Sequence, residues 1–137
     1  METGNSTLSK LTSLVTVATS LLGPLTLSDA DSSAATVAAA ILSRSGRTYT
    51  GVCLHLNCGI GFCAEHAAVA EMIKARETEI EMVVAVGAAG IMAPCGRCRE
   101  LFAQVSMANF SCLIGLPDGR LATLKDLLPE YWMTVSS

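Results

Sequence analysis

Residues 61–87, GFCAEHAAVAEMIKARETEIEMVVAVG, contain a helical pattern followed at once by a strand pattern. From Ala64 to about Arg76, apolar and charged residues recur as they do on the two faces of a helix. From Glu81 to Gly87 the residues are almost continuously apolar and rich in Val, which is typical of a buried strand. The stretch therefore predicts one helix-to-strand unit of an α/β fold.

The segments on either side of this unit extend the same alternation. Residues 36–43 and 49–56 are strand-like and are separated by a turn at Ser45 and Gly46, so we expect a β-hairpin. Residues 98–107 predict a second helix and residues 110–116 a further strand. This order requires crossover connections and therefore a parallel portion of the sheet. Residues 121–132 are expected to form a short terminal helix and tail.

The beginning of the chain has two interpretations. KLTSLVTVATSLL, residues 10–22, has the length of the apolar region of a signal peptide, but no convincing cleavage site of small residues follows. Apolar residues recur there at helical spacing, namely Leu8, Leu11, Val15, Ala18 and Leu22. We favour an amphipathic first helix, followed by a loop from Gly23 that is rich in turn-forming residues.

Composition limits the classes of partner. The 137 residues suit a single domain spanning 1–137. Charged residues make up 15% of the chain, against roughly 25% in typical soluble proteins, so we expect part of the surface to be buried against another subunit. A net charge of −3 provides no basic field for a polynucleotide. Apolar runs end well before the ~20 residues that a membrane span needs.

Three of the six cysteines lie at the predicted helix starts. Cys63 precedes the first crossover helix, and Cys95 and Cys98 open the second one, after Pro94. Both helix starts should lie at the end of the sheet where α/β proteins bind ligands. Thiols three residues apart on a helix face the same way, and a helix N-terminus favours the thiolate. We therefore predict a tetrahedral zinc site and reduced thiols, as in a cytoplasmic protein.

Other side chains near the thiols have predicted supporting roles. Three thiolates leave the site with a net charge of −1, and we expect His66 and Arg97, rather than Arg99, to offset it through hydrogen bonds to sulfur. Glu65 lies two residues after a ligand, so it should point elsewhere than Cys63 and face the open position of the metal. A carboxylate there can act as a general acid and base.

Several residues near the predicted site also have structural interpretations. Cys58 could supply a fourth thiolate and close a structural zinc site. Cys53 and Cys112 lie in predicted strands and suit small buried apolar positions better than ligand positions. His55 is either a structural histidine of the second strand or a substrate contact. The remaining charged groups, including Lys10, Lys74 and the run RETE, are expected on solvated helix faces.

The two metal-type motifs, CAEHAA and PCGRCRE, resemble the signature of the cytidine deaminase superfamily. VAAAILSRSGRTYTGV is similar to the paired strands of that family, and LLPEYW to its C-terminal ending. The resemblance implies a three-layer α/β/α fold with a mixed five-stranded sheet and helices on both faces. It also implies one Zn²⁺ per subunit bound by Cys63, Cys95 and Cys98, proton transfer by Glu65, and hydrolytic deamination at C4 of a cytosine ring.

The small members of this family with three cysteine ligands are typically homotetramers whose sites are completed by neighbouring subunits. The resemblance thus implies that Trp132 or Tyr131 reaches an adjacent pocket. We expect the small-molecule substrate to be contacted by the following residues: Ala35, Cys53, His55, Ala64 and Trp132.

Some of these positions depart from the family pattern. Ala35 stands where ordinary cytidine deaminases have a Phe, and Cys53 and His55 stand where an Asn and a Glu hold the ribose hydroxyl. APCGRCRE and TGV are most similar to the blasticidin S deaminase branch. A cytosine nucleoside with a modified sugar is therefore the expected alternative to cytidine. The other hypotheses are a deaminase of N4-substituted cytosines or another aminated heterocycle, and a non-catalytic structural-zinc protein.

Overall fold

The predicted hairpin forms in the computed structural model, which describes residues 2–133, and it lies at one edge of the sheet. Within those residues the strands are β1 (Leu25–Thr26), β2 (Ser33–Ser43), β3 (Thr48–His55), β4 (Ile80–Gly87), β5 (Gly90–Met92), β6 (Leu113–Gly115) and β7 (Leu121–Thr123). β2 pairs antiparallel with both β3 and β4, β4 pairs parallel with β6, and β7 closes that edge antiparallel to β6. β1 and β5 add short antiparallel pairs to β2 and β4.

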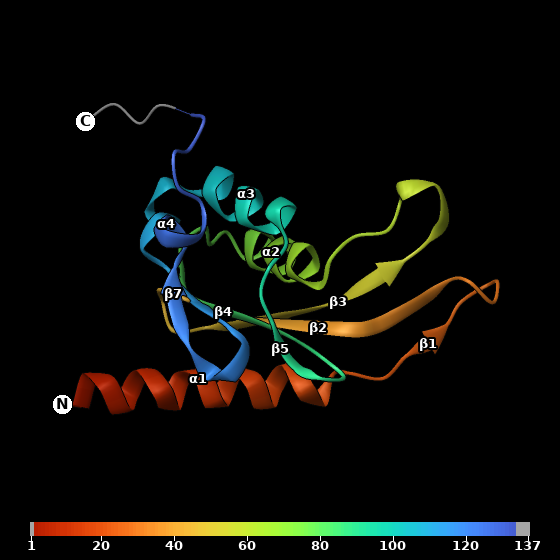
Figure 1. Ribbon diagram of the computed structural model, residues 1–137, viewed down its shortest axis with the longest axis horizontal. Helices are drawn as coiled ribbons and strands as arrows, with labels where there is room; N and C mark the ends of the chain where they lie inside the picture. Colours follow the sequence, from red (N-terminus) through yellow and green to blue (C-terminus); the bar gives the residue numbers. More distant parts are fainter. Residues whose placement is uncertain (1, 134–137) are drawn as a thin grey trace.

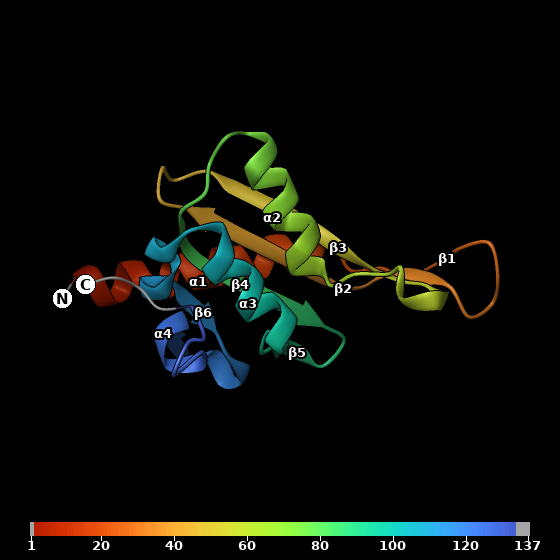
Figure 2. The same cartoon turned by 90° about the horizontal axis from the view of Figure 1, so that it is seen from above.

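Helices cover both faces of this sheet, as Figures 1 and 2 show. The α-helices of the described residues are α1 (Glu2–Ser20), α2 (Ala64–Lys74), α3 (Gly96–Val105) and α4 (Leu124–Leu127), with the 3₁₀ turns η1 (Asn57–Gly59), η2 (Met107–Ser111) and η3 (Pro117–Gly119). α1 lies on one face, and α2 and α3 lie side by side on the other. The predicted α/β layered fold is confirmed. Among the helices of residues 2–133, none combines the length and hydropathy needed to cross a membrane.

Strand alternation explains why the central strands are apolar throughout. Ala38, Ala40 and Val84 belong to the buried cluster under α1, whereas Ala39 and Val83 belong to the cluster under α2 and α3. Successive side chains of a strand point to opposite faces, and here each face is covered by helices. This double burial accounts for the Ala- and Val-rich sequence of β2 and β4.

The first helix forms as predicted, but its buried stripe is shifted. Leu11, Leu14 and Ala18 are buried against the sheet. Leu8 was expected on this stripe, but its side chain is 55% exposed. The apolar stripe of a helix is wide, so several residues compete for the contact and the tilt of the helix decides among them.

The crossover connections set the position of the helix starts. β3 and β4 are both antiparallel to β2, so they run in the same direction, and α2 joins them. α3 joins the parallel strands β4 and β6. Both helices therefore begin at the end of the sheet where β3 and β4 finish, as predicted. Figure 2 shows the two helices crossing the sheet next to each other.

The edges of the sheet differ from the sequence prediction. Within residues 2–133 the sheet has seven strands where the resemblance implied five. β1, β5 and β7 have no counterpart among the stretches predicted as strands, and they contain only two or three residues each. Residues 110–116 were predicted as one strand, but η2 occupies residues 107–111 and β6 only 113–115. The segment expected to be a terminal helix begins with β7. Such short pairings are determined by the neighbouring strand and leave no periodicity in the sequence.

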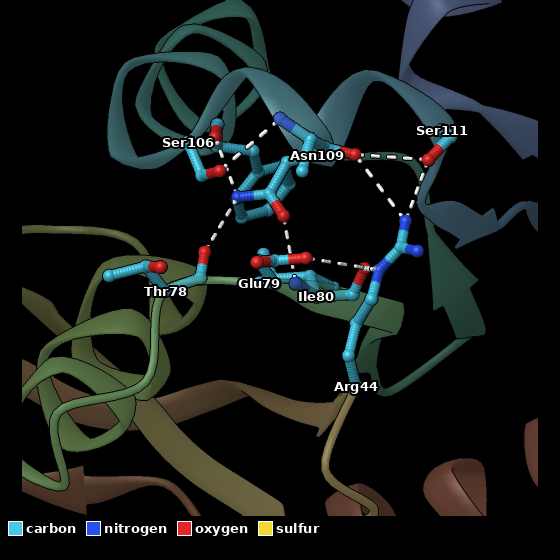
Figure 3. A network of polar contacts seen from close by, with 9 residues as sticks. Arg44, Thr78, Glu79, Ile80, Ser106, Asn109 and Ser111 are labelled. Carbon is cyan, nitrogen blue, oxygen red and sulfur yellow. Dashed lines mark hydrogen bonds and ion pairs between the residues drawn. The ribbon is translucent and has the colours of Figure 1, made fainter.

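Asn109 fixes the end of the sheet opposite the helix starts. Its side chain is fully buried, and its Nδ2 donates to the backbone oxygens of Thr78 at 3.1 Å and Phe102 at 3.0 Å. Its Oδ1 accepts a hydrogen bond from the Ile80 amide at 2.8 Å. Figure 3 shows this amide between η2 and the start of β4; in the same network Arg44 donates to Ser111 Oγ at 2.6 Å. The network ties the end of α3 to β4, so α3 is held from its C-terminal side.

Candidate metal and catalytic site

The three predicted ligand cysteines lie at the two helix starts. Cys63 is the N-cap of α2, and Cys95 is the N-cap of α3; both have extended backbone with φ near −70°. Cys98 lies three residues into the first turn of α3 and is fully buried. Neither N-cap side chain bonds the backbone of its helix. The two thiols are therefore free to face each other across the gap between the helices.

The sulfur atoms are spaced as metal ligands. Cys95 Sγ lies 3.6 Å from Cys63 Sγ and 3.6 Å from Cys98 Sγ. The ligand atoms of Cys63 and Cys98 lie within 4.8 Å of each other. Sulfurs that share a tetrahedral zinc at ordinary bond length are about 3.8 Å apart. The donor set and its spacing fit a zinc ion with little rearrangement.

His66 belongs to the same group of side chains. Its Nδ1 lies 3.6 Å from Cys98 Sγ, and its ligand atom lies within 4.8 Å of those of Cys63 and Cys98. This distance suits either a hydrogen bond to sulfur or a shared metal. Burial and the charge of Arg97 lower the pKa of His66, which favours the neutral imidazole. The sequence predicted His66 beside the metal ligands. In the structure its ring nitrogen is also close enough to compete with the thiols for the metal.

The thiols differ in their tendency to ionise in the metal-free protein. Burial, together with the charge of Glu65, raises the pKa of Cys98. Burial also raises the pKa of Cys63. For Cys95, burial is outweighed by the amide groups at the start of α3 and by the thiols of Cys98 and Cys63, and the pKa is lowered. Cys95 is therefore the first of the three thiols to offer a thiolate.

Glu65 is a buried carboxyl group at the base of the site. It lies in the first turn of α2, and its side chain is 5% exposed. Burial raises its pKa, although its own backbone amide and the Cys98 thiol lower it in part. A buried carboxyl group with a raised pKa, next to a cluster of thiols, is suited to accept and return a proton near neutral pH.

A cavity of about 490 Å³ opens beside the thiols and Glu65. Its wall is formed by the end of β3, the segment that leads into α2, the bulged part of β2, and the residues before α3. Seventeen residues line it: Thr36, Val37, Cys53, Leu54, His55, Leu56, Gly59, Gly61, Phe62, Cys63, Ala64, Glu65, Ala85, Met92, Ala93, Cys95 and Arg97. The volume lies in the range of pockets that hold small-molecule ligands.

Three of the five expected substrate residues line this cavity: Cys53, His55 and Ala64. Ala35 does not. It has φ of 62°, and the pairing of β2 shifts between Ala34 and Ala38. This irregularity, typical of a β-bulge, brings Thr36 and Val37 to the cavity wall in its place. Periodicity does not reveal a bulge, so the sequence selected the neighbouring residue.

Trp132 also lies away from the cavity of its own chain. Its indole Nε1 donates to Glu100 Oε2 at 2.9 Å, and Tyr131 Oη donates to the same oxygen at 2.7 Å. The Tyr131 ring meets Phe110 edge to face, with centroids 5.1 Å apart. The Trp132 side chain remains 69% exposed. The terminal segment is thus attached to α3 with its largest aromatic ring facing solvent.

The two basic residues of the second motif, Arg97 and Arg99, have different surroundings and different roles. Arg97 lines the cavity, whereas Arg99 donates from Nε to the Pro94 oxygen at 2.9 Å and from Nη1 to the Leu127 oxygen at 3.1 Å. Arg99 therefore holds the start of α3 against α4. Cys58 is exposed on η1. Like Cys95, it is outside the group Cys63, His66 and Cys98, whose ligand atoms all lie within 4.8 Å of one another. All six cysteines are free thiols, as predicted.

Sequence reasoning missed several residues of the cavity wall, and Thr36 and Phe62 are two of them. Thr36 is exposed there, and its Oγ1 lies 3.2 Å from Cys53 Sγ. Phe62 immediately precedes Cys63 and also lines the wall. The position of Phe62 next to the CAE motif was a usable signal, whereas the exposure of Thr36 depends on the bulge.

No family model matches the chain. Solved structures of cytidine deaminases do resemble it. The enzyme from Mycobacterium tuberculosis is 28% identical with a TM-score of 0.74, over 90% of this chain and 98% of that one. The enzyme from Mycobacterium leprae is 24% identical with a TM-score of 0.73, over 88% and 98% of the two chains. The enzyme from Bacillus anthracis is 19% identical with a TM-score of 0.63, over 93% and 88%. The chain thus has the cytidine deaminase fold, and the likeness supports the superfamily suggested by its motifs.

Proposed function

We propose that this protein is a zinc-dependent hydrolytic deaminase of the cytidine deaminase superfamily that acts on a cytosine nucleoside. The observation that carries the proposal is the triangle of thiols at tetrahedral spacing, placed beside a buried carboxyl group and open to a cavity of about 490 Å³. The structural likeness to cytidine deaminases supports the same reaction class. Reduced thiols agree with a cytoplasmic location.

Cys63, Cys95 and Cys98 would hold the zinc ion, one per chain. Zinc at such a site supplies an acidified water and a Lewis acid. The Nδ1 atom of His66 lies 3.6 Å from the Cys98 sulfur. With a hydrogen on this nitrogen it would donate to the sulfur and, with Arg97 close by, offset the negative charge of three thiolates. The two helix N-termini contribute in the same direction.

Glu65 moves the protons of the reaction. It accepts a proton from the attacking water and delivers one to the amino group that leaves C4. The C4–N bond breaks, a C4–O bond forms, and the cytosine ring plus water becomes a uracil ring plus ammonia. The burial of Glu65 supports this role because a raised pKa brings the carboxyl group closer to the working pH.

The cavity wall favours a substrate that differs from plain cytidine at the sugar. Cys53 and His55 stand where the family pattern has its ribose-binding pair, and Thr36 bonds Cys53 rather than remaining free. Sites built to bond a hydroxyl owe much of their selectivity to those contacts. A nucleoside with a modified sugar, such as blasticidin S, is therefore the preferred candidate within the class.

The test is a substrate panel on zinc-loaded protein. We expect about one zinc per chain and loss of the 4-amino group, followed by ultraviolet absorbance and ammonia release, with at least one of cytidine, deoxycytidine and blasticidin S. N4-substituted cytosines extend the panel to the wider-pocket hypothesis, in which Ala35 leaves room for a larger leaving group. Turnover of none of these compounds would refute the proposed substrate class.

A structural zinc site is the second candidate, and it is favoured by one observation. His66 forms with Cys63 and Cys98 the group whose ligand atoms all lie within 4.8 Å of one another. A metal held by these three and by Cys95 would have all four positions filled and no water to activate. Cys58 is the other group that could close the site. Replacing His66 by Gln would then lower zinc affinity steeply, whereas in the deaminase it should mainly change the rate. Cys58→Ser tests the remaining option in the same way.

We propose a homotetramer in which Trp132 completes the cavity of a neighbouring chain. The exposed indole and its attachment to α3 support this assembly. We expect the mass of four chains in analytical ultracentrifugation. Trp132→Ala should lower kcat/KM by about tenfold, through lost contact with the substrate or its pocket. Trp132→Phe keeps an aromatic ring and loses the bond to Glu100, so it should retain most activity. A monomeric wild type would contradict the proposal.

A further inference from the structure

The substrate cavity has a single benzene ring in its wall. Of the described residues that line it, Phe62 alone carries one. A planar heterocycle needs a flat apolar surface beside it, and the position that supplies an aromatic ring in the family pattern is Ala35, which lies outside the wall. An unassigned aromatic side chain therefore stands next to the reaction site.

The backbone of Phe62 is held firmly with respect to the site. Phe62 and Leu54 exchange two backbone hydrogen bonds of 3.0 Å each, forming an isolated bridge to β3. Gly61 lies so close to β3 that a Cβ there would be 2.3 Å from the Leu54 oxygen. Cys63 follows as the N-cap of α2. The ring is thus attached one residue before a candidate zinc ligand, on a segment anchored to the sheet.

The other two phenylalanines are already engaged. Phe102 is fully buried in the core, and Phe110 stacks on Tyr131. Phe62 is half-buried, and within residues 2–133 it forms no ring pair. It therefore retains surface that a ligand in the cavity can cover.

We propose that Phe62 packs against the heterocycle of the substrate and is a specificity-determining residue of this site. The inference rests on the proposed function, since it assumes that a planar base occupies the cavity. It assigns to Phe62 the apolar contact that Ala35 cannot make. Because the contact is with the base, its contribution should be the same for substrates with different sugars.

The experiment measures binding in the absence of turnover. Cytidine and deoxycytidine are titrated by calorimetry into zinc-loaded Glu65→Gln protein, with and without Phe62→Leu, and zinc content is measured for each variant. We expect Phe62→Leu to raise both Kd values by about tenfold, the effect of one aromatic contact, with zinc content unchanged. Phe62→Tyr keeps the ring and should stay within about twofold. Phe110→Leu is the matched control outside the cavity and should leave Kd unchanged.

The possible results separate the two claims. If the Phe62-containing protein binds both nucleosides and Phe62→Leu binds them equally well, Phe62 has no part in recognition and the inference fails while the proposed function stands. An equal loss of affinity in Phe62→Tyr and Phe62→Leu would show that the side chain acts through packing and would also overturn the inference. A loss of zinc in Phe62→Leu that accounts for its weaker binding would overturn it in the same way. If neither nucleoside binds to protein that keeps Phe62, blasticidin S replaces them in the same titration. Failure of all three ligands to bind refutes the proposed substrate class, and the inference with it.

Discussion

Glu65→Gln is expected to lower kcat of the zinc-loaded protein by about 1,000-fold or more, while the protein keeps its zinc. Gln preserves the size and hydrogen-bonding capacity of the side chain but cannot carry a proton between water and the leaving amine. Proton transfer by a positioned side chain contributes roughly 100- to 10,000-fold in such reactions. The measurements are the rate of ultraviolet change on the best substrate of the panel and the zinc content per chain.

Glu65→Gln should not lower the folding stability of the metal-free protein, although it lowers kcat. Burial raises the pKa of Glu65 in the folded metal-free protein, so its ionised form is disfavoured there relative to the unfolded chain. The carboxylate therefore costs stability above its unfolded pKa, and this cost grows as pH rises through the folded pKa. The neutral amide removes it. Metal-free Glu65→Gln should be at least as stable as wild type at neutral pH by urea denaturation.

A matched control lies on the same helix. Glu71 is exposed on α2, and its Oε1 accepts a hydrogen bond from the Thr50 amide at 2.9 Å, which a Gln side chain can also accept. Glu71→Gln should leave kcat unchanged. If Glu65→Gln behaves like Glu71→Gln, with full zinc and unaltered properties, the metal site is structural and the proposed chemistry is wrong.

The grouping of the three thiols at the candidate metal site was predictable because it depends on local geometry. Cys95 and Cys98 share one helical turn, and Cys63 precedes the other helix, so helix starts and sheet direction suffice to bring the three thiols together. His66 was expected near them for the same reason. Whether it bonds a sulfur or competes for the metal depends on a fraction of an ångström, which spacing in the sequence cannot resolve.

The substrate wall was less predictable because it depends on long-range packing. The bulge that presents Thr36 arises from a shift in the pairing of β2 with β3, and alternation within β2 gives no sign of it. Phe62 is fixed by a bridge to Leu54 of β3, and the segment that carries Phe62 has no strand pattern of its own. The short strands β5 and β7 exist only because β4 and β6 offer free edges.

Gly51→Ala is expected to destabilise the fold by about 3 kcal/mol and to weaken zinc binding by about tenfold or more. Gly51 lies in β3, directly under α2. A Cβ there would be 2.4 Å from the Ala68 nitrogen, 2.5 Å from the Ala67 Cβ and 2.8 Å from the Ala64 oxygen. Two of these atoms belong to the helix backbone, so relief requires α2 itself to move.

Displacement of α2 would carry Cys63 and Glu65 away from α3. We therefore expect weaker zinc binding as well as lower stability, whereas overpacking of the core alone would lower only the stability. Urea denaturation of metal-free protein measures stability, and titration against a chromophoric chelator measures zinc affinity. Gly23→Ala is the control, because a Cβ at Gly23 meets nothing within 4 Å. Loss of stability with unchanged zinc affinity would mean that the closeness of β3 and α2 serves the core alone. Loss of both would show that the absence of a side chain at Gly51 keeps α2 where its first residues can bind the same metal as the first residues of α3.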